Sequence, residues 1–299
     1  MPERTAIRPY IPFETISSEN PVQTGFDLKP TIAWTGANKE ILKTKMESRL
    51  AMNLAPSPHP ESITPAENSD LDPAFVRPLL GLIPEGIRQL SACDQILGMN
   101  TLWFKNVAPG MPIEPTDTIS DAISPTALAT GATTDEINPP HLSVLLCKLP
   151  QDIIPDEEVR RLILGTTVVH EYFHTITWGL LNDPDKEIQL PDGQITQGAA
   201  FIKNMFGKAA EAHSPVSHYS SGYRNEDNTF QEREGSTDLA IEEEFVETLT
   251  TLTLGFASGN LRDVTIDPLD DREDLKSICL DFLGAIPVAT KSTDKEIAT

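Results

Sequence analysis

Two histidines four residues apart, with a glutamate directly after the first, are the residues of this sequence best suited to chemistry. They are His170, Glu171 and His174 in the segment HEYFH. Residues four apart lie on one face of an α-helix, so both imidazoles can face a single metal ion. Glu171 is then placed beside the metal, where its carboxylate can take a proton from a water molecule. Imidazole ligands with one coordination position left open are typical of hydrolytic zinc sites, so we expect one Zn²⁺ per chain.

The motif needs a long helix to position it. The segment 166–181 is apolar on nearly all sides, which is typical of a helix buried in a core. Pro155 and three acidic residues at 156–158 precede it, and negative charge in a first turn complements the helix dipole. The sequence NDPD at 182–185 is expected to end the helix. The competing interpretation is a buried helix with two core histidines and no metal.

A catalytic zinc usually takes three protein ligands, so one more must come from outside the motif. In the extended motif HExxHxxGxxH, a glycine and a third histidine follow. Those two positions hold Thr177 and Leu180 here, so this arrangement is excluded. His213 and His218 lie in a polar segment and would reach the metal only if the tertiary fold brought them there.

Acidic residues on a later helix, expected over 237–258, are better candidates for the third ligand. Glu243 and Glu247 are four apart and share a face. We therefore expect Glu243 to bind the metal and Glu247 to support a ligand from behind. Glu242 and Glu244 stay open as alternative ligands, and the competing interpretation of all four is a solvated acidic helix face.

The composition limits the partners. The chain has 299 residues, a net charge of −22 and a pI of about 4.5. This charge argues against nucleic acid and anionic membrane surfaces and suits a basic or neutral peptide or protein substrate. No apolar run approaches about 18 residues, and the first residues lack the apolar region of a secretory signal. We expect a soluble protein without a membrane span, either cytoplasmic or exported by a signal-independent route; the oligomeric state stays unknown.

The three cysteines are Cys93, Cys147 and Cys279. They are widely spaced, odd in number and form no CxxC pair, which argues against a disulfide framework. We expect free thiols, mostly in helix or strand cores.

Three regions are predicted along the chain. Residues 1–70 are rich in proline and expected to be loosely structured. Their exception is one helix at 38–53, which either docks or targets the protein or simply packs on the main domain. Residues 71–287 are the predicted catalytic domain, and 288–299 are a polar tail.

Hydrophobic patterns predict the remaining elements of the main domain. Two helices separated by Pro84 are expected over 71–97, followed by a strand within 96–107. Residues 108–140 are expected to form a long surface loop, including a hairpin, before a strand at 141–149. Further helices are expected at 197–212, at 237–258 with Gly259 closing it, and at 270–283, with a loop at 213–235.

The order of these motifs resembles the gluzincin metallopeptidases, in particular the catalytic domain of anthrax lethal factor and the Pro-Pro endopeptidases. The matching stretches are VVHEYFHTITW at 168–178, SHYS at 217–220 and EEFVETL at 243–249. The resemblance implies Glu243 as third zinc ligand and Tyr219 as a hydroxyl donor near the metal. Between Tyr219 and Glu243 lie more residues than is usual in that family, and they include Tyr223, so either tyrosine can take this role.

The resemblance further implies an α+β fold, namely a helix-rich zincin-like metallopeptidase domain with a small mixed sheet and a long active-site helix. The expected function is a zinc-dependent endopeptidase that hydrolyses peptide bonds with a zinc-activated water. Glu171 would transfer the proton. The strand at 141–149 would flank the cleft and pair through its edge with an extended peptide. The alternatives are a catalytically inactive zincin-like binding or scaffold protein and a helical protein that binds no zinc.

Overall fold

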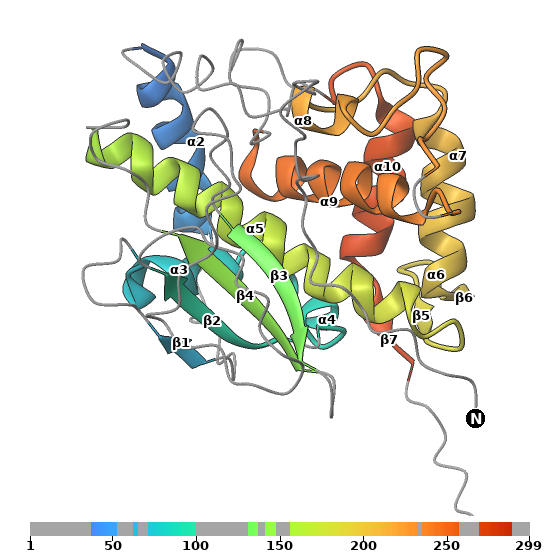
Figure 1. Cartoon of the computed structure of the whole chain (residues 1–299), viewed down its shortest axis with the longest axis horizontal. Helices are drawn as coiled ribbons and strands as arrows, with labels where there is room; N and C mark the ends of the chain where they lie inside the picture. The colour runs from blue at the N-terminus through green and yellow to red at the C-terminus, as the bar shows by residue number, and fades with distance from the viewer. Residues whose placement is uncertain are drawn as a thin grey trace, which may run out of the picture.

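The chain folds into an α+β structure in which helices predominate (Figure 1). The computed structural model describes residues 37–52, 62–64, 71–91, 93–99, 131–136, 141–147, 156–232, 235–256 and 269–288. Two small sheets and one long central helix, α5, organise these segments. Among the helices described, none combines the length and the apolar character needed to cross a bilayer.

The larger sheet is mixed and has four strands, β1 (Ser62–Thr64), β2 (Cys93–Met99), β3 (Gly131–Glu136) and β4 (His141–Cys147). Their order is β1-β2-β4-β3; β1, β2 and β4 are parallel, and β3 is antiparallel to β4. Of residues 108–140, where a loop with a hairpin was expected, the structure describes the strand 131–136, which pairs with β4. The expectation that the strand at 141–149 offers a free edge was wrong, because β2 and β3 pair with β4 on both sides. The edge on that side belongs to β3.

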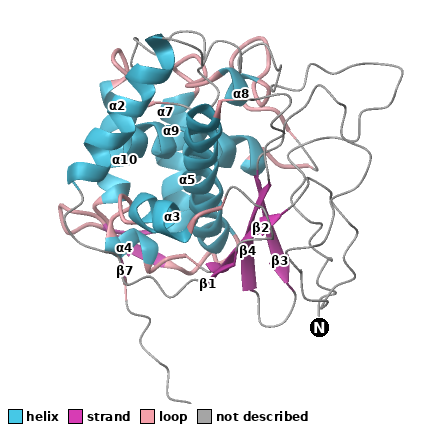
Figure 2. Ribbon diagram, turned by 90° about the vertical axis from the view of Figure 1, so that its left-hand side faces the viewer, coloured by secondary structure: helices cyan, strands magenta, loops and turns pink. Residues whose placement is uncertain are grey.

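Helix α5 (Glu157–Leu181) lies between this sheet and the other helices (Figure 2). Its beginning was predicted correctly: the side chain of Asp156 accepts hydrogen bonds from the backbone N–H groups of Glu158 (2.9 Å) and Val159 (3.2 Å). The helix ends at Asn182, whose N–H donates to the carbonyl of Trp178. Nearly all of α5 is buried, as the apolar sequence predicted, because the sheet, α3 and α9 contact it from different sides.

The segment before the large sheet differs from expectation in its second half. Helices α3 (Pro73–Leu80) and α4 (Glu85–Arg88) are separated at Pro84, as predicted. The second helix does not continue to residue 97, because β2 begins at Cys93 and pairs with β1 and β4. Strand pairing across the sequence therefore overrides local helix propensity here. The strand-like run at 102–104 lies outside the described residues.

A second, antiparallel sheet follows α5 and consists of β5 (Glu187–Gln189), β6 (Ile195–Gln197) and β7 (Ile286–Pro287). The helix expected at 197–212 exists as three joined pieces, α6 (Gly198–Ala200), the π-helix η1 (Phe201–Phe206) and α7 (Gly207–Ala210). A short helix, α8 (His218–Ser221), interrupts the loop expected at 213–235.

Two further helices complete the body, α9 (Asp238–Leu254) and α10 (Glu273–Leu283). Helix α9 ends earlier than the predicted Gly259. Gly255 adopts a left-handed conformation with φ +81°, and its N–H donates to the carbonyl of Thr251 at 2.7 Å. Glycine adopts this conformation without the steric penalty of a side chain, so it closes the helix there. Phe245 of α9 packs between the rings of Phe206 and Phe282 and so anchors the helix in the core.

The helix predicted at 38–53 is present as α2 (Ala37–Met52) and packs on the main body. Leu42 and Met46 are buried, and α2 contacts both α5 and α9. Lys39 pairs with Asp156, the N-cap of α5, at 2.9 Å. The interpretation of a packed helix is therefore confirmed. Nothing in these contacts requires a separate docking or targeting role.

The cysteine prediction holds for the two thiols that can be described. Cys93 and Cys279 are both buried, as expected of thiols in a core, and Cys279 is a free thiol. The side chain of Cys147 lies outside the described residues.

Candidate metal centre

Helices α5 and α9 lie side by side and bring the two predicted histidines to one glutamate. His170, His174 and Glu243 each offer one ligand atom, and these atoms lie within 4.8 Å of one another. The two Nε2 atoms are 3.1 Å apart. The Glu243 carboxylate lies 3.7 Å from the Nε2 of His170 and 3.6 Å from that of His174. All three side chains are buried.

The other nitrogen of each imidazole contacts a carboxylate. His170 Nδ1 lies 3.0 Å from Glu247 and His174 Nδ1 lies 3.1 Å from Glu242. A carboxylate beside Nδ1 favours the tautomer in which Nδ1–H donates a hydrogen bond to it and Nε2 has the lone pair. Thr177 donates a hydrogen bond from its hydroxyl to the same oxygen of Glu242 at 2.6 Å. We assign the Nδ1–H tautomer to both histidines from this network, so that two Nε2 lone pairs face each other.

This donor set fits a cation. Glu243 is fully buried, and among the described residues neither of its oxygens has a hydrogen-bond partner. An unsatisfied buried carboxylate beside two ring lone pairs is unfavourable unless a positive charge lies between them. Ligands of a tetrahedral zinc at about 2.0–2.1 Å are separated by about 3.3 Å. The observed separations of 3.1, 3.6 and 3.7 Å are close to that value.

The local electrostatics agree with a cation at this position. Burial, and then the negative charge of Glu247, raises the pKa of Glu243 well above its usual range. Burial lowers the pKa of His170, but Glu247 and neighbouring carboxylates outweigh it, so the net shift is upward. Without a metal, this cluster of buried carboxylates therefore favours taking up protons, and a divalent cation replaces them with a stronger partner.

Glu171 follows His170 on α5 and is buried, with 5% of its surface exposed. It is the residue directly after His170, so the two side chains leave neighbouring positions of the same buried helix. The role of Glu171 as a proton acceptor stays a prediction.

The remaining candidate ligands take other positions. Glu244 accepts a hydrogen bond from the backbone N–H of Val216 at 2.9 Å and does not join the group of three. His213 forms an ion pair with Asp274 at 2.8 Å. The side chain of His218 lies outside the described residues.

The structure assigns no role at the site to either candidate tyrosine. Tyr219 belongs to α8, which contacts α9, but its side chain lies outside the described residues. Tyr223 is 4% exposed and belongs to the hydrophobic core. The role of Tyr219 therefore stays a prediction.

The sequence alone did not predict the contact of Glu242 with His174 or the hydrogen bond from Thr177 to Glu242. Glu242 was considered only as an alternative ligand, and Thr177 only as a position without glycine. A signal existed, because Thr177 follows His174 by three residues and shares its helix face. Glu247 occupies the supporting position that was predicted for it.

Alanine at Glu242 or at Glu247 is expected to weaken zinc binding by about 10–100-fold, because each carboxylate fixes one imidazole. Competition with a chelator of known affinity measures this change. Thr177→Val keeps the side-chain shape but removes the hydroxyl. Zinc affinity should therefore fall in this variant too, but by less than in the glutamate variants. Unchanged affinity in both glutamate variants would show that the carboxylates do not hold the ligands.

Comparison of the chain with protein-family models, with curated proteins and with solved structures gave no match. The likeness to gluzincins therefore consists of the short motifs quoted above. The functional argument depends on the site residues themselves and on their geometry.

Proposed function

We propose that this protein is a zinc-dependent endopeptidase with a zincin-like catalytic domain, which uses His170, His174 and Glu243 to hold one Zn²⁺. The observation that carries the proposal is the Glu243 carboxylate, fully buried and without a hydrogen-bond partner among the described residues, facing two Nε2 atoms. Two imidazoles and one carboxylate, with a fourth position left for water or substrate, are a donor set typical of hydrolytic zinc.

In the proposed reaction, different residues of the chain would transfer the proton and orient the metal ligands. When bound, zinc would supply Lewis acidity, which lowers the pKa of a water ligand toward neutral pH and polarises the scissile carbonyl. Glu171 takes a proton from the attacking water and passes it to the leaving amine. Glu242 and Glu247 keep both imidazoles oriented while charge develops in the transition state.

Strand β3 is the best candidate for holding an extended peptide. It lies at the edge of the large sheet, next to β4, and it contacts α5, which carries the histidines. An edge strand has backbone N–H and C=O groups available for pairing with another chain. The negative charge of the protein favours basic or neutral substrates over acidic ones.

Tyr219→Phe is expected to lower turnover by about 10²–10³, because a hydroxyl donor acts mainly on the oxyanion of the transition state. Zinc content and melting temperature should stay near wild type, since no ligand is removed. Steady-state kinetics on a cleavable peptide measure the effect. Tyr223→Phe is the control and should be mild; a crippled Tyr223→Phe beside an active Tyr219→Phe would transfer the role to Tyr223.

Two measurements on the purified chain test the proposed function. Elemental analysis should find one zinc per chain, and a quenched-fluorescent peptide library should be cleaved in a chelator-sensitive way. Zinc without cleavage would favour the inactive zincin-like binding or scaffold protein. Absence of zinc would favour the other alternative, a helical protein that binds no zinc and has the two histidines in its core.

A further inference from the structure

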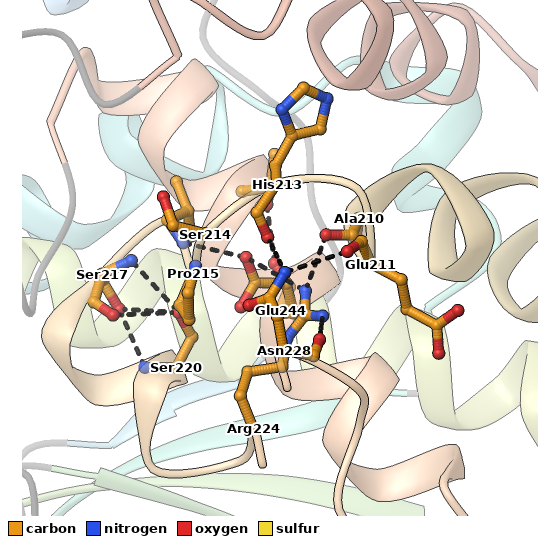
Figure 3. Close-up of polar contacts among 12 residues, drawn as sticks. Ala210, Glu211, His213, Ser214, Pro215, Ser217, Ser220, Arg224, Asn228 and Glu244 are labelled. Carbon is orange, nitrogen blue, oxygen red and sulfur yellow. Dashed lines mark hydrogen bonds and ion pairs between the residues drawn. The ribbon is translucent and has the colours of Figure 1, made fainter. Parts of the chain in front are cut away.

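The segment 210–232 precedes α9 in the chain, and the side chain of Arg224 holds it together (Figure 3). Arg224 donates to the carbonyl of Asn228 at 2.8 Å and to that of Ala210 at 3.2 Å. Its guanidinium also lies 3.6 Å above the ring centroid of Phe230. One buried side chain thus ties the two ends of the segment together.

A second residue closes the same segment. Asn228 has a left-handed backbone with φ +69°, which asparagine tolerates better than most residues. Its side-chain amide donates to the carbonyls of Glu211 and His213. Two contacts then join the segment to α10: the ion pair between His213 and Asp274, and a hydrogen bond from Arg272 to Ser214 at 3.0 Å.

Glu244 joins this fastened segment to α9. Its carboxylate is fully buried, accepts the backbone N–H of Val216 at 2.9 Å and lies 3.8 Å from the Arg224 guanidinium. Val216 directly precedes the turn into α8, and α8 contacts α9. A buried carboxylate with a backbone donor and a cation beside it is costly to displace. Glu244 is also the next residue after Glu243, so one helix turn carries both contacts.

We propose that Glu244 is a positioning residue, which holds the segment 210–232, and with it α8, in a fixed place on α9, the helix that also carries Glu243. This inference rests on the proposed function. Neighbouring glutamates then have separate tasks: Glu243 binds the metal, and Glu244 fixes the segment that carries Tyr219, the predicted hydroxyl donor.

Glu244→Ala, Glu244→Gln and Glu243→Ala, each in the full chain, test this division. Hydrogen–deuterium exchange reports on the segment 211–232, with α5 as the internal reference, and chelator competition reports zinc affinity. Glu244→Ala should speed exchange in 211–232 by about tenfold or more, while α5 stays protected, because local opening loses its main anchor. Zinc affinity should stay within about threefold of wild type, since no ligand or supporting carboxylate is removed.

Glu244→Gln keeps an oxygen acceptor for the N–H of Val216 and should restore most of the protection of 211–232. It can also be measured if Glu244→Ala does not fold. Glu243→Ala should show the reverse pattern, with zinc lost and the segment protected. At an assay temperature well below the melting temperature of the variant, Glu244→Ala should have a lower kcat/KM than wild type on a peptide that wild type cleaves. Glu244→Gln should recover the wild-type kcat/KM.

Unchanged exchange in Glu244→Ala would overturn the proposal, as would a loss of zinc equal to that of Glu243→Ala. If Glu244→Gln recovers the protection of 211–232 from exchange but does not recover kcat/KM, the proposal is also overturned. If wild type cleaves no peptide at all, the proposed function fails, whereas the exchange and zinc measurements still decide whether Glu244 anchors the segment independently of the metal.

Discussion

Glu171→Gln is expected to abolish peptide hydrolysis and leave the fold and the zinc content unchanged. Glutamine has nearly the shape of glutamate, but its amide cannot accept the proton that the attacking water must lose. Removal of a general base typically lowers a rate by about 10²–10⁴. Glu171 follows a metal ligand on a buried helix, so the substitution changes one charge without creating a cavity. Progress curves on a cleavable peptide, with zinc measured in the same samples, give the result.

Glu157→Gln is the matched control, because it makes the same chemical change on the exposed first turn of the same helix. It should retain wild-type activity. If Glu171→Gln hydrolyses peptides at the wild-type rate, Glu171 does not transfer the proton. If both variants lose activity together with zinc, the loss comes from the helix and not from the chemistry.

Glu243→Ala is expected to release zinc. Loss of a direct ligand should exceed the about 10–100-fold effect of losing a supporting residue. The variant should also lose the thermal stabilisation by metal. A ligand present at about 1,000 times its dissociation constant stabilises the native state by about 4.1 kcal/mol. Wild type should therefore melt at a higher temperature with zinc than with a chelator, and Glu243→Ala should melt at the same temperature in both.

Glu244→Ala provides the adjacent control for zinc binding, since its carboxylate contacts Val216 and Arg224 and lies outside the group of metal ligands. It should keep its zinc-dependent melting temperature. If instead Glu244→Ala loses zinc and Glu243→Ala retains it, the ligand is one residue further along α9 than the structure places it.

The sequence alone determined the part of the site that depends on local geometry. His170, Glu171 and His174 lie within a single helix, so their spacing fixes their relative positions once the helix forms. The start of that helix was equally readable, because Pro155 and the acidic residues at 156–158 are local signals; the structure shows that Asp156 is its N-cap. The shared face of Glu243 and Glu247 follows from the same rule.

The roles of the four glutamates of α9 were decided by tertiary contacts. Glu242, Glu243, Glu244 and Glu247 are all buried, so no boundary between a polar and an apolar face marks their functions. Glu242 takes its role from Thr177, which is 65 residues away, on α5. Glu244 takes its role from a segment 28 residues earlier. Periodicity in one helix contains no information about which neighbours pack against each side of it.

Strand pairing shows the same division. The apolar run HLSVLLCKL predicts a strand at β4, but the internal place of β4 in the sheet depends on β2 and β3, which come from other parts of the chain. Residues 93–97, which the sequence predicts as the end of a helix, are part of β2 for the same reason. Local propensities are worth a few tenths of a kcal/mol per residue, up to about 1 kcal/mol, whereas a strand held on both sides gains hydrogen bonds and burial over its whole length. The tertiary structure therefore decided which strand lies at the edge of the described sheet and which glutamate lies against the two histidines, since both depend on contacts between distant segments.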